Sequence, residues 1–255
     1  MDTRLPPLVI REGLQRVEVA CVPEFSYAFQ PIVDVVAREV YSYEALIRGR
    51  ANESAFHVLE RVPAHAKYQF DEESRAAALA LAVRLGLKCH LNLNFLPQGI
   101  YATDTSVAST FSAAARHGLP IDRVILEVTE GEFVADYAHL GQRLNEFRSM
   151  GLKLAIDDFG AGYSGLNMLA DFQPDQIKID MNLVRGIESN GPRQAIVRAV
   201  VQVCGDLGID VIAEGVETLA EYDCFVDYGV RLFQGYLFAK PGFESLPRAH
   251  FPVRD

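Results

Sequence analysis

Seven apolar runs in this 255-residue chain end in an acidic or amide side chain, and this repetition constrains the fold more than any other feature. Five runs carry Asp or Glu, at residues 43–48, 124–130, 154–160, 177–180 and 211–215, and two carry Asn or Gln, at 91–94 and 232–235. Such runs, rich in β-branched residues, are typical of strands buried on both faces. Because an unpaired buried charge is costly, we expect these oxygen ligands to share hard cations such as Mg²⁺ or Mn²⁺.

The order of the predicted elements indicates an α/β barrel. Eight strands are predicted, at residues 26–33, 40–47, 89–94, 123–129, 153–158, 175–180, 210–214 and 231–235. Helical patterns separate most of them, near residues 53–62, 71–87, 105–117, 134–150, 165–172, 192–207 and 217–228. Eight alternating strands and helices in a chain of about 250 residues predict a closed TIM (β/α)8 barrel.

One connection departs from this pattern. Only six residues, 34–39, separate the first two predicted strands. Parallel strands need a crossover of about a dozen residues or more, so these two strands must form an antiparallel hairpin. The prediction is therefore a modified TIM barrel with one antiparallel strand.

Composition places limits on function. The net charge of −10 argues against a nucleic-acid-binding surface, so no DNA partner is expected. The four cysteines form no CxxC pair and lie among apolar neighbours, which indicates reduced core thiols. The N-terminus lacks the apolar core of a signal peptide, and the apolar stretch 76–83 is too short to span a bilayer. We therefore expect a cytoplasmic protein without membrane insertion.

In a βα barrel the active site lies at the C-terminal ends of the strands. Six side chains are predicted to lie near these ends: Asn92, Glu127, Asp157, Asp180, Glu214 and Gln234. Glu44 lies on a strand whose partner is reversed, so the pattern alone does not give its depth. Any one carboxylate is more simply a helix cap or a surface charge, but that explanation fails for six separate strand ends.

The adjacent pair Asp157-Asp158 is the most specific local feature. Neighbouring residues at a strand end point in different directions, so one carboxylate could bridge two metal ions while the other binds one. Two metals about 4 Å apart can hold the attacking and leaving oxygens of a phosphoryl displacement. Lys178 shares a strand face with Asp180 and could hold a water or a phosphate oxygen, or form only a structural ion pair. The glycine-rich segment 160–165 is no P-loop, and its position favours a gating or coupling role.

Taken together, these residues resemble the EAL-domain phosphodiesterases, which hydrolyse cyclic di-GMP. The resemblance covers about residues 26–243. It rests on eight strings: Gln30-Pro31-Ile32-Val33, Glu44-Ala45-Leu46-Ile47-Arg48, Leu91-Asn92-Leu93, Leu126-Glu127-Val128-Thr129-Glu130, Asp157-Asp158-Phe159-Gly160-Ala161-Gly162-Tyr163-Ser164, Lys178-Ile179-Asp180, Ala213-Glu214-Gly215-Val216-Glu217-Thr218 and Gln234-Gly235-Tyr236-Leu237. Within the family, the chain most resembles EAL domains attached to blue-light-sensing BLUF domains, here with no BLUF-like segment before residue 25.

The resemblance implies a barrel with one antiparallel strand and a set of functional residues. The implied ligands of two Mg²⁺ or Mn²⁺ ions are Glu44, Asn92, Glu127, Asp157, Asp158 and Asp180. The residues implied around the hydrolytic water are Lys178, Gln234 and Glu214, the last as general base. The residues implied to contact the dinucleotide are Gln30, Leu46 and Arg48. The resemblance also implies that Glu130 holds the glycine loop, which in this family links dimerisation to metal binding.

The predicted function is therefore metal-dependent hydrolysis of cyclic di-GMP to linear pGpG by a homodimer. Residues 26–255 would form the EAL phosphodiesterase domain, and residues 1–25 an N-terminal arm. Ca²⁺ prefers more ligands at longer distances, so it is expected to bind but inhibit. One alternative is a non-catalytic EAL module that binds cyclic di-GMP or a protein, although such modules usually lack ligands that this chain retains. Another is a metal-dependent barrel enzyme for a different phosphate ester, which explains the carboxylates but not the full motif set.

Overall fold

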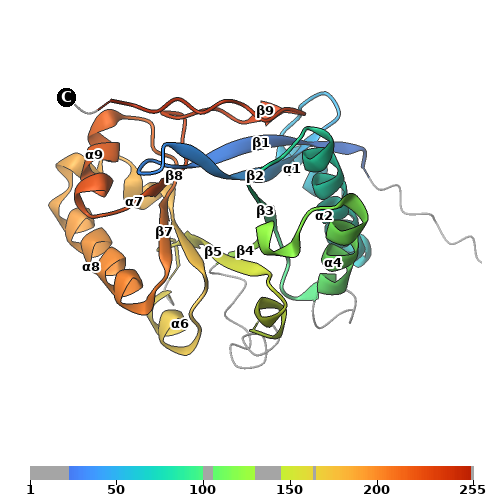
Figure 1. The fold of residues 1–255 in the computed structure, drawn as a ribbon, viewed down its shortest axis with the longest axis horizontal. Helices are drawn as coiled ribbons and strands as arrows, with labels where there is room; N and C mark the ends of the chain where they lie inside the picture. Colours follow the sequence, from blue (N-terminus) through green and yellow to red (C-terminus); the bar gives the residue numbers. More distant parts are fainter. Residues whose placement is uncertain (1–22, 100–105, 130–144, 163–164, 254–255) are drawn as a thin grey trace, which may run out of the picture.

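The computed structural model describes residues 23–99, 106–129, 145–162 and 165–253. Its strands form one closed barrel (Figure 1). The eight barrel strands are β1 (Phe25–Asp34), β2 (Glu39–Gly49), β3 (His90–Asn94), β4 (Val124–Thr129), β5 (Lys153–Phe159), β6 (Gln176–Ile179), β7 (Asp210–Ala213) and β8 (Leu232–Phe233). Strands β2 to β8 run parallel, and β1 closes the barrel antiparallel to both β2 and β8. The predicted modified TIM barrel, with its eight strands and its reversed first strand, is confirmed.

The hairpin that reverses β1 is closed by a tight turn at residues 35–38. Asp34 Oδ1 accepts hydrogen bonds from the backbone N–H groups of Val36 (2.9 Å) and Ala37 (3.0 Å). Its other oxygen, Oδ2, accepts from the Arg231 guanidinium at 2.7 and 3.1 Å, which ties the turn to the residue preceding β8. A short turn stabilised by an Asp side chain joins only antiparallel strands, as the short connection predicted.

Helices cover the outside of the barrel. The longer ones are α2 (Lys67–Arg84), α4 (Ser106–His117), α6 (Gly165–Asp171), α8 (Gly191–Leu207) and α9 (Leu219–Asp227). The short ones are α1 (Ala55–Leu59), α7 (Met181–Val184) and the 3-10 turns η1 (Ala64–Ala66), η2 (Ile121–Arg123) and η4 (Ile187–Ser189). Figure 1 shows α2 and α4 on one side of the barrel and α8 and α9 on the other. No helix within the described ranges is long and apolar enough to cross a membrane.

Most helices and strands lie where the sequence pattern predicts them, with three differences. Helix α2 begins at Lys67, four residues before the predicted start at Asp71. The four-residue helix α7 and the short strand β9 (Gly242–Phe243), which pairs with β1, were not predicted. Residues 130–144 of the predicted helix 134–150 lie outside the described residues.

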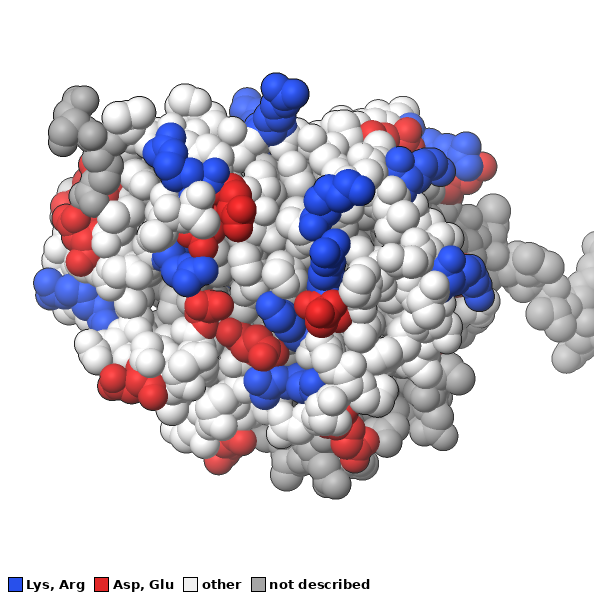
Figure 2. All heavy atoms as spheres, viewed as in Figure 1, with Lys and Arg blue, Asp and Glu red and all other residues white. Residues whose placement is uncertain are grey.

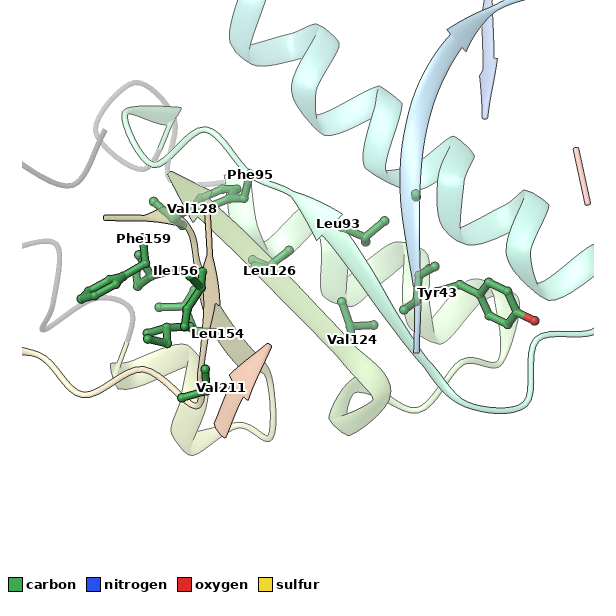
Figure 3. Packing of buried hydrophobic residues seen from close by; sticks show 14 of the residues in the cluster. Tyr43, Leu93, Phe95, Val124, Leu126, Val128, Leu154, Ile156, Phe159 and Val211 are labelled. Atoms are coloured by element: carbon green, nitrogen blue, oxygen red, sulfur yellow. The ribbon is translucent and has the colours of Figure 1, made fainter. Parts of the chain in front are cut away.

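The main hydrophobic core lies between the barrel strands and the helices. Val124, Leu126 and Val128 alternate along β4 on its outer face, and Leu154 and Ile156 do the same on β5 (Figure 3). The residues between them therefore point into the barrel, because successive strand side chains face opposite sides. This alternation places Glu127 and Asp157 in the interior.

A small apolar cluster lies inside the barrel. Ile32, Ile212 and Leu232 are fully buried there and form a second, smaller cluster. On the face seen in Figure 2, acidic and basic side chains are interspersed, and the described residues form no extended basic patch in that view. The polar end of the barrel is where the candidate site lies.

Candidate active site

Lys178 lies at the centre of a cluster of carboxylates at the C-terminal end of the barrel. The side chain is only 1% exposed. Its Nζ lies 2.7 Å from Glu214 Oε1, 3.0 Å from Glu127 Oε1, 3.0 Å from Asp157 Oδ1 and 3.6 Å from Glu44 Oε2. Side chains from the middle of β2, from β4 and β5, and from the residue after β7 thus converge on one ammonium group.

Electrostatics show that one lysine does not balance this cluster. Burial lowers the pKa of Lys178, but the neighbouring carboxylates, Asp157 first among them, outweigh burial and raise it well above its usual value. Burial raises the pKa of Glu127 to about 8, even though the Lys178 charge opposes the shift. Burial also raises the pKa of Glu214 well above its ordinary value, and the Lys178 charge again opposes the shift. The site therefore has an excess of buried negative charge, which favours additional cations.

Asn92 and Glu127 present oxygen atoms that no described residue satisfies. Asn92 Nδ2 donates a hydrogen bond of 2.8 Å to Glu127 Oε1. The Asn92 Oδ1 and Glu127 Oε2 atoms are buried and lack a hydrogen-bond partner within the described part of the chain. Buried polar atoms are seldom left unpaired, so these two acceptors fit a role as cation ligands.

The carboxylates form two compact groups that share one member. Oxygen atoms of Glu44, Glu127 and Asp157 lie within 4.8 Å of one another, and so do those of Asp157, Asp158 and Glu214. This all-oxygen arrangement suits Mg²⁺, Mn²⁺ or Ca²⁺ rather than softer metals. Asp157 belongs to both groups.

The backbone at Asp158 separates the two adjacent carboxylates. Asp158 has a φ of +54°, in the left-handed region, and its N–H donates to Asp157 Oδ1 at 3.0 Å. Two residues on, Gly160 also has a positive φ, and a Cβ there would lie 2.5 Å from Leu183 Cδ1. Burial, then the charges of Asp157 and Asp180, raise the pKa of Asp158. The turn thus sets the direction of the Asp158 side chain, and a carboxylate oxygen of Asp158 remains within 4.8 Å of oxygens of Asp157 and Glu214.

Asp180 also serves as the N-cap of helix α7. Its Oδ1 accepts hydrogen bonds from Asn182 N at 3.0 Å and from Asn182 Nδ2 at 2.8 Å. Asp180 lies outside both compact groups, but it lines the same cavity, whose volume is about 280 Å³. The capping role and the metal-ligand role are compatible, because a carboxylate has two oxygens.

Two glutamines complete this cavity. Gln234 Nε2 donates to Glu44 Oε2 at 2.7 Å and to Gln30 Oε1 at 3.4 Å. Gln30 Nε2 in turn donates to the carbonyl of Ala239 at 3.1 Å. Both glutamines lie in the cavity with the carboxylates, so the structure joins Gln30, Glu44 and Gln234 in one network.

Leu46 and Arg48 line a second, larger cavity of about 600 Å³. This cavity is mainly apolar and lies between β2 and the α1–α2 region, and it reaches the carboxylate cluster at Glu127. Arg48 Nη1 donates to the carbonyl of Ile47 at 2.8 Å. The two predicted dinucleotide contacts therefore flank the cluster from the adjoining cavity.

Some residues that line the carboxylate cavity were not predicted as site residues, and one predicted site residue lies outside the described residues. Met181, Arg185, Glu217 and Tyr236 line the carboxylate cavity. Glu217 and Tyr236 occur in the quoted strings, whereas nothing in the sequence pattern marks Met181 or Arg185. Glu130 and the interaction predicted for it lie outside the described residues.

Comparison with known proteins agrees with this geometry. The sequence profile of the EAL domain matches residues 15–241. The chain belongs to the EAL domain family. The crystal structure of a standalone EAL protein from Vibrio cholerae O395 in its c-di-GMP-bound form is 47% identical, with a TM-score of 0.85, covering 89% of this chain and 96% of that one. The Klebsiella pneumoniae BlrP1 manganese/cy-diGMP complex at pH 9.0 is 44% identical, with a TM-score of 0.87, covering 91% and 59%, and a calcium/cy-diGMP complex of BlrP1 matches at a TM-score of 0.85.

Curated relatives of this EAL domain are longer proteins. The blue light- and temperature-regulated antirepressor BluF of Escherichia coli K12 is 34% identical over 89% of this chain and 57% of its own length. The cyclic di-GMP phosphodiesterase RocR of Pseudomonas aeruginosa is 34% identical over 66% of this chain and 42% of its own length. The chain therefore spans about half the length of these relatives.

Proposed function

We propose that this EAL domain hydrolyses cyclic di-GMP to linear pGpG with water activated by two Mg²⁺ or Mn²⁺ ions. The observation that carries the proposal is the pair of carboxylate groups that share Asp157 and surround Lys178. Every ligand position of the predicted set carries an oxygen donor. The cyclic di-GMP complexes of similar EAL proteins and the name of RocR support the same substrate and reaction.

The metal ions, when bound, would supply a nucleophilic water and neutralise charge on the phosphate. We assign their ligands to Glu44, Asn92, Glu127, Asp157, Asp158 and Asp180. Glu214, which lies in the buried cluster 2.7 Å from Lys178 Nζ, would accept the proton of the attacking water, and Lys178 and Gln234 would orient that water or the phosphate. Gln30, Leu46 and Arg48 bind the dinucleotide, with Arg48 on a phosphate.

A regulatory function without hydrolysis is the second candidate, because BluF is named an antirepressor. The complete ligand set favours hydrolysis over a purely regulatory role. The two functions are separated by incubating the protein with cyclic di-GMP and Mn²⁺ and resolving nucleotides by chromatography. Formation of pGpG is expected, and binding with no turnover would favour the regulator.

Metal identity provides a further prediction. Turnover should occur with Mg²⁺ or Mn²⁺, whereas Ca²⁺ should bind without supporting turnover. Ca²⁺ takes six to eight ligands at longer distances, which would misplace the attacking water. Steady-state rates with each metal alone, followed by Ca²⁺ titration into the Mn²⁺ enzyme, measure this directly. Full turnover with Ca²⁺ as the only metal would contradict the expectation.

We also infer a cytoplasmic homodimer. The dimer is inferred from the resemblance to the EAL family, in which the glycine-rich loop links dimerisation to metal binding. Sedimentation velocity of the purified protein should show a dimer. A monomer at micromolar concentration, with metal and nucleotide present, would contradict this inference.

A further inference from the structure

Two loops at the C-terminal end of the barrel carry residues of the site, and Glu221 of α9 contacts both. The first loop follows β6 and contains helix α7, whose N-cap is Asp180 and which ends at Val184, just before Arg185 and Gly186. The second loop follows β7 and carries Glu214 to Thr218. Glu221 is only 4% exposed, although it belongs to neither loop.

The two oxygens of the Glu221 carboxylate are divided between the loops. Oε2 accepts hydrogen bonds from the backbone N–H groups of Glu217 (2.9 Å) and Thr218 (3.1 Å) in the second loop. Oε1 accepts from the N–H of Gly186 (3.2 Å) in the first. Burial raises the pKa of Glu221, but these three backbone hydrogen bonds outweigh it and lower the pKa below its ordinary value.

Arg185 adds a second bridge beside the first. Its Nη2 donates to Glu217 Oε1, and its Nη1 lies 3.8 Å from Glu221 Oε2. The first loop is therefore joined to the second in two ways. The backbone N–H of Gly186 is linked to it through Glu221, and the Arg185 side chain contacts it directly. Because a buried carboxylate that accepts several hydrogen bonds has little freedom, this junction fixes both loop ends.

Close packing transmits the constraint to the site. Gly215 follows Glu214 directly, and a Cβ at Gly215 would lie 2.9 Å from Met181 Cβ. Met181 follows Asp180 directly, so the two loops touch at the residues next to both site carboxylates. Helix α7 has four residues, about 6 Å in length, and ends at Val184, so Gly186 is separated from Asp180 by one short helix and Arg185.

We propose that Glu221 is a positioning residue that fixes Asp180 and Glu214 relative to each other and thereby sets the affinity of the site for divalent cations. Its effect on turnover rests on the proposed function, whereas its effect on cation affinity does not. Only a side chain with two acceptor oxygens can accept from both loops. A glutamine side chain has one acceptor oxygen and one donor nitrogen, so it must lose its hydrogen bonds to one of the two loops.

The test compares Glu221→Gln with Thr218→Ala. Thr218 Oγ1 accepts from Glu221 N at 3.2 Å, so Thr218→Ala weakens the same helix N-terminus but leaves the carboxylate bridge in place. Mn²⁺ affinity is measured by calorimetry, together with kcat, KM and the melting temperature. Supports of metal ligands typically contribute about 10- to 100-fold to metal affinity or activity, and a loss in that range is expected for Glu221→Gln. Thr218→Ala should lower the melting temperature with Mn²⁺ affinity and kcat unchanged.

Two outcomes would overturn the inference. Unchanged Mn²⁺ affinity in folded Glu221→Gln would overturn it, and so would equal losses in both variants, since these would show a capping effect alone. If Glu221→Gln does not fold, Glu221→Asp replaces it: it keeps the charge, but its shorter side chain cannot reach both loops, so weaker Mn²⁺ binding is again expected. If the wild type binds Mn²⁺ and the variants differ as expected, yet no cyclic di-GMP is hydrolysed, the proposed function fails and the positioning role stands.

Discussion

Glu44→Ala should abolish turnover of cyclic di-GMP while the barrel remains folded. The Glu44 carboxylate belongs to one of the two compact groups and accepts from Gln234, so its loss removes a proposed metal ligand and disconnects the glutamine network. The loss should exceed the ~10–100-fold that is typical of removing a mere support of a ligand. Hydrolysis rates at saturating Mn²⁺ and thermal melting measure activity and folding separately.

Ser42 provides a matched control on the same strand. It lies two residues before Glu44, so it faces the same side of β2, and its buried Oγ has no hydrogen-bond partner in the described part of the chain. Ser42→Ala should therefore leave turnover unchanged. A folded Glu44→Ala protein with the wild-type rate would remove Glu44 from the mechanism.

Lys178→Ala and Glu214→Gln should each lower kcat far more than they raise KM. Both side chains lie in the buried cluster, 2.7 Å apart, where they can act on the water or the reacting phosphate. General acid–base groups typically contribute ~10²–10⁴-fold to the rate, and a fall of that order is expected for Glu214→Gln. Steady-state kinetics in the presence of Mn²⁺ give the two parameters.

Stability must be measured alongside these kinetics, because Lys178 also offsets buried negative charge. Without the ammonium group, Glu127, Asp157 and Glu214 repel one another, so Lys178→Ala should melt at a lower temperature when metal is removed. Glu214→Gln removes one of these charges and should not share this effect. Changes confined to KM in both variants would show that the residues only bind substrate.

The sequence pattern predicts the barrel well because the pattern is local. Buried strands are read from apolar runs, and the six-residue connection at residues 34–39 is too short for anything but an antiparallel hairpin. The convergence of Glu127, Asp157 and Lys178 then follows from strand alternation and barrel closure. Strand alternation is set within each segment, and barrel closure follows from the order of the segments along the chain.

Features that depend on contacts between distant segments were not predicted. Helix α7 has four residues, too few for a helical periodicity, and its start depends on the Asp180 cap. The bridge from Glu221 to Gly186 joins residues 35 positions apart, which no short motif reveals. The separation of Arg48 from the carboxylate cavity likewise depends on how β2 packs against the helices beside it.

The central claim is that water, activated within the carboxylate cluster, attacks phosphorus and opens the cyclic dinucleotide. Hydrolysis of cyclic di-GMP in ¹⁸O-labelled water with Mn²⁺, followed by mass spectrometry of the product, tests this claim most directly. The account predicts pGpG with one ¹⁸O atom in its terminal 5′-phosphate, and no labelled product from Glu44→Ala. Tight binding of cyclic di-GMP with no labelled pGpG from the wild-type protein would contradict it.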